Sequence, residues 1–326
     1  MEDSKRLSII IVSWNVRQEL AQCLESIRQH GPQESCEVFV VDNASSDGTV
    51  QMLTENFSFV RILQNQENRG FGAANNQAIT ECRGKYLLFL NPDTRIHADT
   101  LQSLIQFMDD HPDVGACGPK LLNEDGTTQR SVRCFPTFRA VLHRYTALRQ
   151  FKVFARAYKQ WMMMDFAYDT TQDVDQLMGA AILARTRLVR RLGGFDERFF
   201  MYFEEVDLCL RIKQLDQRVM FVPSACITHA GCRSAEQVPV KNNIMALTSL
   251  LKYLRKHRGR GPTFLFNLIF KPLVILRQVC DIVKGLATMV VSLVTWDVQR
   301  REKGWSLVCR GISWLVCHTW RLIFVM

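Results

Sequence analysis

The stretch YLLFLNPDTR, from Tyr86 to Arg95, decides how we interpret the fold of this 326-residue chain. Its first five residues are apolar without alternation, which is typical of a strand buried on both faces of a mostly parallel sheet. Asn91, Pro92 and Asp93 follow directly, so a carboxylate is expected where that strand ends. Ligands of open α/β sheets bind outside the carboxyl ends of the strands. The stretch therefore predicts a ligand-binding residue at Asp93, although an ordinary turn with local hydrogen bonds has the same signature.

The flanking sequence alternates between strand and helix patterns. Apolar runs predict strands at residues 7–12, 38–41, 59–63, 114–117 and 219–222. Amphipathic or small-residue segments predict helices at residues 18–30, 49–56, 73–81 and 187–192. This alternation is the signature of an α/β fold, a wound, mostly parallel sheet flanked by helices.

The net charge of +9 is concentrated in the last part of the chain, where residues 252–326 contain 13 Lys and Arg against three acidic residues. Because this segment is also rich in Trp, Leu, Ile, Val and Phe, an anionic membrane surface is favoured over nucleic acid as its partner. Eleven cysteines without a C-x-x-C motif indicate a reducing cytosol. The N-terminus has no signal-peptide pattern, so the catalytic part is expected on the cytoplasmic side.

The sequence lacks the glycine-rich loops that usually bind nucleotide phosphates. Neither G-x-G-x-x-G after the first strand nor G-x-x-x-x-G-K-[ST] occurs. The charge of a bound diphosphate therefore needs another partner, and a divalent cation held by Asp93 is the simplest one. Asp42 ends a neighbouring predicted strand, where an acid can bind the ribose or the base of a nucleotide.

A second cluster of acids follows an aromatic stretch at residues 195–203. The helical period places Glu205 on an apolar arc, whereas Asp207 lies opposite and can form an ordinary i,i+4 pair with Arg211. A carboxylate near an acceptor hydroxyl can act as a general base. This reasoning favours Glu205 over Glu204 but leaves both open. Gly179, slightly earlier, would let the backbone approach a sugar or a diphosphate, or would simply mark a bulge.

Taken together, several segments resemble the family 2 glycosyltransferases, in particular the bacterial rhamnosyltransferase-like branch. They are LSIIIVSWN, VFVVDNASSDGT, NRGFGAANNQAI, YLLFLNPDT and GAAILARTRLVRRLGGFDERFFMYFEEVDLCLR, and the resemblance covers residues 7–235. It implies a GT-A fold and inverting transfer from a nucleotide sugar, assisted by a divalent cation, Mn²⁺ or Mg²⁺. Asn91 and Asp93 would occupy the outer places of the family's D-x-D motif, with Asn replacing the first carboxylate.

The resemblance also assigns roles to individual residues. The general base falls on Glu205, with Glu204 as the neighbour most easily confused with it, and His229 joins Asp93 as a metal ligand. Asp42 would contact the nucleobase or ribose. The expected donor site comprises Ser13, Asn15, Asp42, Asn68, Gly70, Asn75, Asn91 and Asp93. The expected acceptor site comprises Gly179, Ala180, Phe203 and Asp207.

The expected activity is transfer of a sugar, first of all rhamnose from a thymidine-diphosphate donor, to a lipid-linked or other membrane-held glycan of the cell envelope. Two alternatives stay open. A sugar nucleotidyltransferase has a similar sheet, but it requires a glycine-rich basic loop after the first strand, which is absent here. A non-catalytic membrane scaffold of the same fold would not need Asp93 and Glu205, and both are present.

The expected organisation is a nucleotide-sugar-binding half at residues 1–125, an acceptor-binding and catalytic half at 126–257, and a basic amphipathic helical tail at 258–326. The longest uncharged run of the tail, residues 285–296, is too short to span a bilayer. We therefore expect the tail to lie flat on the cytoplasmic face of the inner membrane, with Trp305, Trp314 and Trp320 in contact with lipid. The alternative is packing against the protein's own core or a homodimer partner.

Overall fold

The computed structural model describes residues 6–31, 36–231, 239–296 and 298–324. The chain forms two compact units, each built from two segments: Met1–Phe135 with Asp165–Val238, and Pro136–Met164 with Pro239–Met326. This division differs from the expected boundaries at 125 and 257, because residues 136–164 and 239–257 belong with the tail. Each unit is described separately below.

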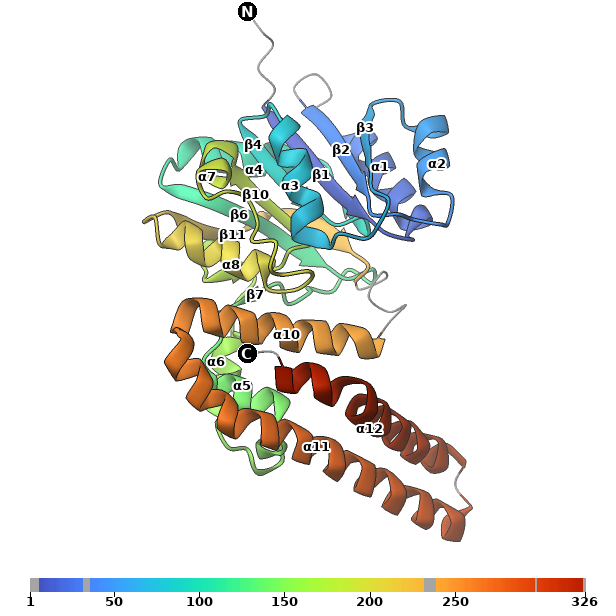
Figure 1. Cartoon of the computed structure of the whole chain (residues 1–326). Helices are drawn as coiled ribbons and strands as arrows, with labels where there is room; N and C mark the ends of the chain where they lie inside the picture. The colour runs from blue at the N-terminus through green and yellow to red at the C-terminus, as the bar shows by residue number, and fades with distance from the viewer. Residues whose placement is uncertain (1–5, 32–35, 232–238, 297, 325–326) are drawn as a thin grey trace, which may run out of the picture. The chain divides into compact units, whose positions relative to one another are not determined.

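The first unit is built around one large sheet (Figure 1). Within the described residues this sheet has nine strands, which include, in spatial order, β3 (Val60–Gln64), β2 (Cys36–Asp42), β1 (Leu7–Ser13), β4 (Tyr86–Leu90), β10 (Ala181–Arg185), β6 (Val114–Leu122), β11 (Arg218–His229) and β5 (Thr94–Ile96). The ninth strand, β8 (Gln172–Asp173), pairs with β11. A separate two-stranded sheet consists of β7 (Val132–Arg133) and β9 (Gln176–Leu177).

Strand direction determines which residues meet at one edge of the sheet. Strands β1 to β4 are parallel, and β11 runs parallel to β6. Strand β10 lies between β4 and β6 and is antiparallel to both, so β4 and β6 point the same way. As a result, the carboxyl ends of β1, β2, β4 and β11 share an edge with the beginning of β10, where Ala181 pairs with Leu90.

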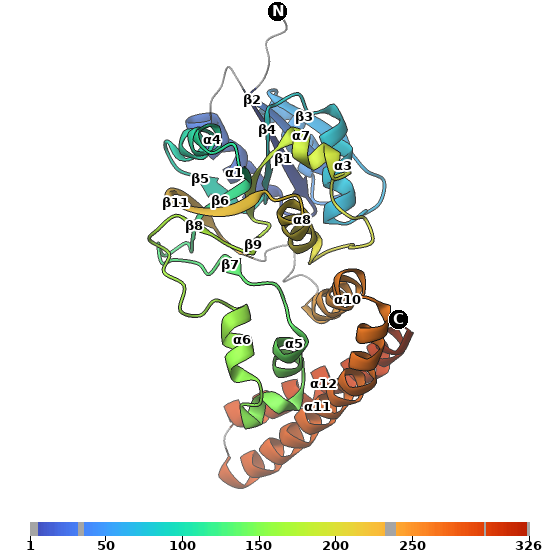
Figure 2. The ribbon, with the colours of Figure 1, turned by 90° about the vertical axis from the view of Figure 1, so that its left-hand side faces the viewer.

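Helices cover both faces of the sheet, as expected for a wound α/β fold. Figure 2 shows α1 (Arg17–His30) and α4 (Thr100–Asp110) on one side, and α3 (Phe71–Glu81) and α7 (Thr186–Arg191) on the other. The remaining helices of this unit are α2 (Thr49–Asn56) and α8 (Glu204–Lys213). All five residues of β4 are buried, which confirms the prediction of a strand covered on both faces.

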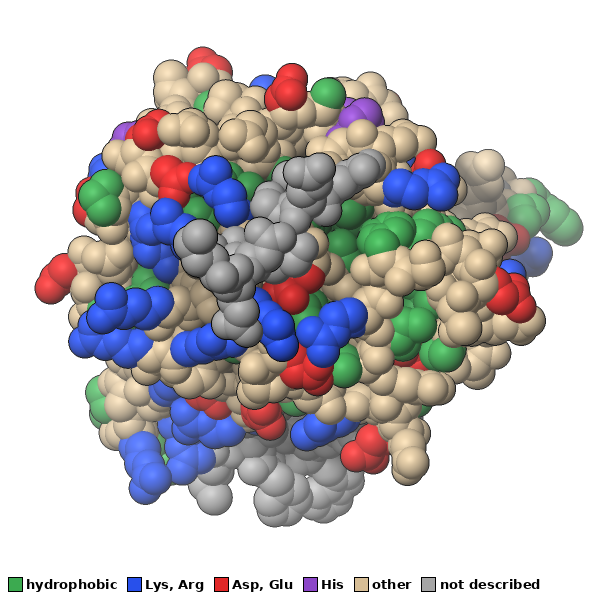
Figure 3. All heavy atoms as spheres, turned by 90° about the horizontal axis from the view of Figure 1, so that it is seen from above, with side chains coloured by type: hydrophobic (Ala, Val, Ile, Leu, Met, Phe, Trp, Pro, Cys, Tyr) green, Lys and Arg blue, Asp and Glu red, His purple; other side chains and the backbone are tan. Residues whose placement is uncertain are grey.

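Charges of both signs occur at the amino ends of the strands. Figure 3, which views the molecule from the end where the N-terminus lies, shows Lys and Arg side chains next to Asp and Glu side chains. Arg6 and Lys85 both form ion pairs with Asp109, and Arg61 pairs with Glu81. Basic residues that begin these strands are therefore neutralised locally.

The second unit is entirely helical within the described residues. It comprises α5 (Phe138–Tyr145), a 3₁₀ helix η1 (Ala147–Phe151), α6 (Ala155–Trp161), α10 (Pro239–Arg258), α11 (Arg260–Thr295) and α12 (Val298–Phe324). The ring of Phe138 stacks on Phe266, with 4.6 Å between the ring centroids, and Tyr145 meets Phe270 edge to face. These aromatic contacts explain why residues 136–164 belong with the tail.

Helices α11 and α12 approach each other closely through glycines. A Cβ atom placed on Gly285 would lie 2.7 Å from the carbonyl oxygen of Gly304, and the reverse distance is the same. Any side chain at either position would push the two backbones apart. No helix among the described residues combines the length and the apolar character needed to cross a membrane.

Candidate active site

The predicted metal ligands meet where β4 and β11 end. The Oδ1 atom of Asp93 lies 3.4 Å from the Nε2 atom of His229, and both side chains are less than a tenth exposed. The Nδ2 atom of Asn91 is also 3.4 Å from this Nε2 atom. The backbone fixes the two residues, because the amide of Ala230 donates to the carbonyl of Asp93 over 2.9 Å and His229 pairs with Thr94 across β11 and β5.

Asp93 and His229 could provide two of the ligands of a bound metal ion. Two cis ligands, each about 2.1 Å from one octahedral cation, would be about 3.0 Å apart, which is close to the observed separation. A carboxylate oxygen with an imidazole nitrogen suits Mn²⁺ better than Mg²⁺, which prefers oxygen alone. In the described part of the chain, no group of three or more His, Cys, Asp or Glu side chains could hold a metal ion. Asp93 and His229 offer two ligands, and a cation held by them would take its other ligands from a bound phosphate and water.

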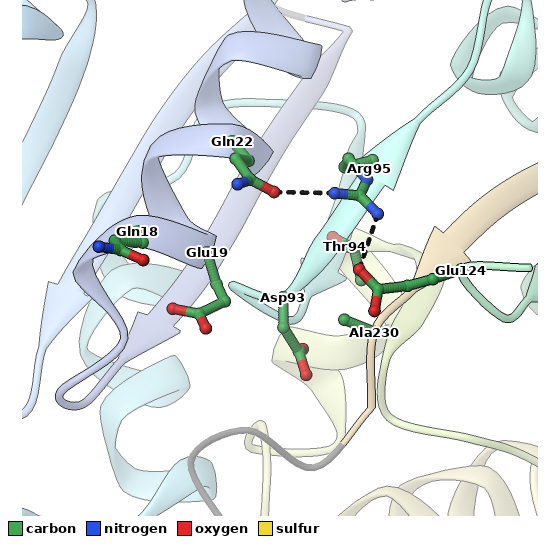
Figure 4. Close-up of a pocket in the computed structure, with 8 residues that line it drawn as sticks. All are labelled: Gln18, Glu19, Gln22, Asp93, Thr94, Arg95, Glu124 and Ala230. Carbon is green, nitrogen blue, oxygen red and sulfur yellow. Dashed lines mark hydrogen bonds and ion pairs between the residues drawn. The ribbon is translucent and has the colours of Figure 1, made fainter.

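A small polar pocket of about 120 Å³ adjoins Asp93 (Figure 4). Arg95 lines this pocket and donates to Gln22 over 2.8 Å and to Glu124 over 3.0 Å. These two hydrogen bonds connect α1 to the turn that follows β6. Glu19 of α1 also lines the pocket. None of these three residues was predicted, because Glu19 and Glu124 lie far from Asp93 in the sequence and Arg95 contacts them or their neighbours only in the folded chain.

Three of the predicted donor-binding side chains are buried and carry an unsatisfied polar atom. The Oδ2 atom of Asp42 accepts from the backbone amide of Ser45 over 3.0 Å. Its Oδ1 atom, the Oγ atom of Ser13 and the Oδ1 atom of Asn75 are buried with no hydrogen-bond partner among the described residues. Buried polar atoms are rarely left unpaired, so these three are candidates for bonding to a ligand or to water.

Other predicted donor-binding residues hold the loops in place. Asn15 adopts a left-handed conformation, with φ of 52°, and its Oδ1 atom accepts from the amide of Ser46 over 2.8 Å. The Oδ1 atom of Asn68 accepts from the amide of Gly70 over 3.0 Å. Gly70 itself must be glycine, because its φ is 82° and an added Cβ would lie 2.2 Å from the carbonyl oxygen of Phe200.

These loops border an open hollow at the carboxyl ends of β2 and β3. Its volume is about 510 Å³, and it is lined by Ala44, Ser45, Gln64, Asn65 and Gln66. The hollow is lined mainly by polar groups and begins two residues after Asp42. Its position and chemistry suit the base and ribose of a nucleotide.

The two acidic candidates for the general base, Glu204 and Glu205, begin α8. Glu204 is only 5% exposed, whereas Glu205, which the helical period places on an apolar arc, is half-buried. Packing against other parts of the chain causes this difference in burial. A Cβ placed on Gly72 of α3 would lie 3.7 Å from the Cβ of Glu204, so α3 covers that residue. Glu205 instead faces Gly179, where there is no side chain to cover it.

Burial changes the acid–base chemistry of this pair. It raises the pKa of Glu204 well above the usual carboxyl range, and the neighbouring charge of Glu205 raises it further. Burial also raises the pKa of Glu205, although backbone hydrogen bonds and the positive charge of Arg133 oppose that shift. The Oε2 atoms of both residues are buried without a hydrogen-bond partner in the described chain. The charge of Arg133 thus favours the ionised form of Glu205, which is the form that a base requires.

The predicted acceptor-binding residues fall into two groups. The amide of Asn91 donates to the carbonyl of Ala180 over 2.9 Å, so Gly179 and Ala180 lie beside the metal segment. Phe203, with φ of 71°, precedes α8 and is half-buried.

Asp207, in contrast, has no exposed surface and forms a 2.7 Å ion pair with Arg211. Arg211 also donates to the carbonyls of Leu192 and Gly194, so the pair joins α8 to the end of α7. A carboxylate enclosed in this way stabilises the fold and is not accessible to an acceptor. We therefore exclude Asp207 from the proposed acceptor site.

Comparison with known proteins identifies the family to which the chain belongs. Residues 8–170, half of the chain, match the family model described as glycosyl transferase family 2. An N-acetylglucosaminyl-diphospho-decaprenol L-rhamnosyltransferase of Mycobacterium tuberculosis is 28% identical over 251 residues, which cover 72% of this chain and 80% of that protein. Rhamnosyltransferase WbbL of Escherichia coli is 26% identical over 266 residues, 77% of this chain and 93% of that protein.

Solved structures share the fold at low sequence identity. Mannosyltransferase PcManGT from Pyrobaculum calidifontis, in complex with GDP-Man and Mn²⁺, has a TM-score of 0.55 and 18% identity, and the match covers 95% of this chain and 87% of that one. GalNAc-T7 with UDP, GalNAc and Mn²⁺ has a TM-score of 0.53 and 14% identity, covering 70% of this chain and 44% of that one. The expected GT-A fold is thus confirmed. The chain belongs to glycosyl transferase family 2 and is similar to the rhamnosyltransferases of that family.

Proposed function

We propose that this protein transfers a sugar from a nucleotide diphosphate donor to a hydroxyl group of a lipid-linked glycan, with inversion at the anomeric carbon. The donor that we expect first is thymidine-diphosphate rhamnose. The support for rhamnose is the similarity to two rhamnosyltransferases, and the name of one of them specifies a sugar on a diphospho-lipid as acceptor. Synthesis of an envelope polysaccharide is the process that such a reaction serves.

The main support for this proposal is that the segment beside Glu205, the proposed base, also contacts the segment that bears Asp93, the proposed metal ligand. The side chain of Glu205 lies against Gly179. The next residue, Ala180, accepts a hydrogen bond from Asn91, two residues before Asp93. An acceptor seated over residues 179 and 180 would therefore have a base on one side and the donor diphosphate on the other.

Each residue has a defined task in this reaction. Glu205 accepts the proton of the acceptor hydroxyl as its oxygen bonds to the anomeric carbon, while the bond to the nucleotide diphosphate breaks. Asp93 and His229 would hold a divalent cation, which neutralises the charge that develops on the leaving diphosphate. Asp42 and Ser13 offer unsatisfied oxygens to the nucleoside. Gly179, which has no side chain, leaves space for the acceptor, whereas Ala180 is buried behind it.

We further propose that the second unit attaches the enzyme to the cytoplasmic face of the inner membrane. Helix α11 is unusual because its outward face is apolar along most of its length. The exposed residues of this face, here called the α11 stripe, are Leu265, Leu268, Ile269, Leu276, Val279, Val283, Leu286, Val290 and Leu293. They span residues 265–293, or about 42 Å of helix. An apolar surface of this size marks an interaction site.

Two charged side chains of α11, those of Arg277 and Asp281, lie off this stripe. Arg277 donates to the carbonyl of Arg144 at the end of α5 over 3.1 Å, and it lies 3.7 Å from Asp281. The side of α11 that carries Arg277 therefore faces α5, and the α11 stripe lies on a different side of the helix. Trp305 is exposed on α12, whereas Trp314 is buried within the unit, contrary to its expected contact with lipid. The side chain of Trp320 lies outside those that the structure describes.

The reaction is tested by offering the purified enzyme a panel of nucleotide sugars and a lipid diphosphate carrying one N-acetylhexosamine. Mass spectrometry should show one added deoxyhexose with the thymidine-diphosphate rhamnose donor. Nuclear magnetic resonance of the product should show that the anomeric configuration is inverted. Addition of another hexose would correct the donor, and retention of configuration would contradict the roles given to Glu205 and the cation. No transfer from any donor, by a correctly folded enzyme, would contradict the proposed function.

A further inference from the structure

Gln129 touches His229 on the side of the imidazole that faces away from Asp93. The Nδ1 atom of His229 lies 2.7 Å from the Oε1 atom of Gln129. The opposite ring nitrogen, Nε2, is the one that lies 3.4 Å from Asp93. Gln129 follows a turn after β6, about 100 residues from His229 in the sequence, and no motif singles it out.

The neighbours of Gln129 determine which way its amide points. Its Nε2 atom donates to the Oδ1 atom of Asn123 over 3.1 Å and lies 3.4 Å from the carbonyl oxygen of His229. Both of these partners are acceptors. The Nδ2 atom of Asn123 donates to Thr127, which in turn fixes the orientation of the Asn123 amide. The Oε1 atom of Gln129 must therefore be the one that faces the imidazole.

A carbonyl oxygen can only accept a hydrogen bond, so the facing Nδ1 atom must carry a proton. In the neutral imidazole this leaves the lone pair on Nε2, which faces the Oδ1 atom of Asp93. Two acceptors that face each other at 3.4 Å repel, unless a cation or a proton lies between them. Gln129 thus selects the tautomer of His229 in which Nε2 is unprotonated. The lone pairs of His229 and Asp93 then face the same point.

The backbone holds Gln129 rigidly in this position. The backbone amide of Gln129 donates to the backbone carbonyl of Leu121 over 2.8 Å. The backbone amide of Asn123 donates to the backbone carbonyl of Thr127 over the same distance. The Oδ1 atom of Asp125 accepts from the amide of Thr127 within this turn. The turn folds Gln129 back from the end of β6 onto the end of the neighbouring strand β11.

We propose that Gln129 is a positioning residue for metal binding: it fixes the tautomer and the ring orientation of His229, so that Nε2 is always available to the cation held with Asp93. This inference rests on the proposed function, because it takes His229 as a metal ligand. Hydrogen bonds to the distal nitrogen of ligating histidines commonly change metal affinity by about 10- to 100-fold. Gln129 should act in this range without touching the substrate.

The test compares Gln129→Leu, which removes the acceptor, with Gln129→Glu, which keeps an acceptor at the same place. The first measurement is the ¹⁵N chemical shifts of the His229 ring in the full-length, metal-free protein. His111 and His143 serve as internal references, because the Nδ1 atom of each lies within 3 Å of a backbone carbonyl oxygen, that of Phe107 at 2.8 Å and that of Val153 at 2.6 Å. The second measurement is Mn²⁺ affinity, by electron paramagnetic resonance, in the presence of thymidine diphosphate.

We expect Gln129→Leu to shift the His229 ring signals toward a mixture of tautomers and to weaken Mn²⁺ binding by about 10-fold or more. Gln129→Glu should preserve the Nδ1–H tautomer and keep or strengthen Mn²⁺ binding, and the reference histidines should not change in either variant. If Gln129→Leu leaves the tautomer or the Mn²⁺ affinity as in the wild type, the inference is overturned. A wild-type protein that binds no Mn²⁺ would instead overturn the proposed metal site, so the two failures are distinguishable.

Discussion

Gly179 lies directly against Glu205: a Cβ atom added to the glycine would be 3.7 Å from both the Cβ and the Cγ of the glutamate. These are ordinary contact distances, so a methyl group would fit there. A longer side chain would extend along Glu205 toward its carboxylate. The space beside the proposed base is therefore maintained by the absence of a side chain on the neighbouring segment.

This relationship predicts a size threshold at position 179. Gly179→Ala should retain most of its activity, whereas Gly179→Leu should lower kcat/KM by about 10-fold or more, because a misplaced catalytic contact of about 1 Å costs about 100-fold. Steady-state kinetics with the acceptor varied would measure this loss, and calorimetry should show unchanged nucleotide binding. Equal activity of the two variants would contradict the proposed space for the acceptor.

The second prediction separates the two adjacent glutamates. Glu205→Gln should reduce kcat by about 10² to 10⁴-fold while leaving donor affinity unchanged, because a general base acts on the acceptor hydroxyl. Glu204→Gln should reduce it far less, since α3 covers Glu204. In the wild type, kcat/KM should increase as the pH rises through the raised pKa of Glu205, because only the ionised form is a base. A larger loss for Glu204→Gln would transfer the role to Glu204.

The third prediction concerns stability. Burial and the charge of Glu205 raise the pKa of Glu204 above its value in the unfolded chain, so the folded state binds this proton more tightly. The stabilising contribution of that proton is present at low pH and is lost as the pH rises through the raised pKa. Glu204→Gln removes the ionisable group, so the variant should have a higher Tm than the wild type at neutral pH, with a difference that shrinks at acid pH. Thermal melts across pH 4–8 would measure this, and a lower Tm at neutral pH would contradict it.

Local sequence patterns correctly predicted the strands that carry the site. The apolar runs before Ser13, Asp42 and Asn91 are continuous, and in a parallel sheet their ends must meet at one edge. The antiparallel strand β10 was not predicted, because its place in the sheet depends on pairing with β4 and β6, strands that lie far from it in the sequence. That strand is what brings Gly179 to Asn91.

Other features of the structure were also not predicted, because they depend on contacts between residues that are distant in the sequence. The apolar arc of α8 drew attention to Glu205, but the burial of Glu204 is caused by α3, which the pattern of one helix cannot reveal. Gln129 was not selected because its partner lies on a different strand. The packing of Phe138 on Phe266 likewise joins segments that the sequence analysis had assigned to different parts of the chain.

The fourth prediction tests the metal site. Asp93→Ala should weaken binding of a nucleoside diphosphate in the presence of Mn²⁺ to the level that the wild type shows with a chelator, because the diphosphate charge would lose its cation. Isothermal calorimetry of both proteins, with and without Mn²⁺, makes the comparison. Asp196→Ala is a suitable control, since that carboxylate pairs with Arg198 and lies outside the proposed site. Equal affinity under all four conditions would rule out a role for the cation in donor binding.

The last prediction concerns the α11 stripe. Its exposed side chains each stand to gain about 1 kcal/mol on partial burial in lipid, and each nearby Lys or Arg contributes about 1 kcal/mol at an anionic surface. High salt should therefore release the protein from membranes only partly. Truncation after residue 257 is a poor test, because it would remove Phe266 and Phe270 from their contacts with Phe138 and Tyr145. Point substitutions on the exposed face avoid this loss.

Replacing Leu276 and Val283 together by Asp should weaken binding to vesicles with anionic lipid by about 30-fold or more, as expected for a loss of about 2 kcal/mol or more. The matched control places the same two charges on α2, as Gln51→Asp and Thr54→Asp, where both side chains are exposed. Co-sedimentation would compare the three proteins, and donor binding should be equal in all of them. If the stripe variant binds vesicles as the wild type does, the stripe is not the membrane surface. A wild type that ignores vesicles but sediments as a dimer, which the stripe variant does not form, would make the stripe a subunit interface.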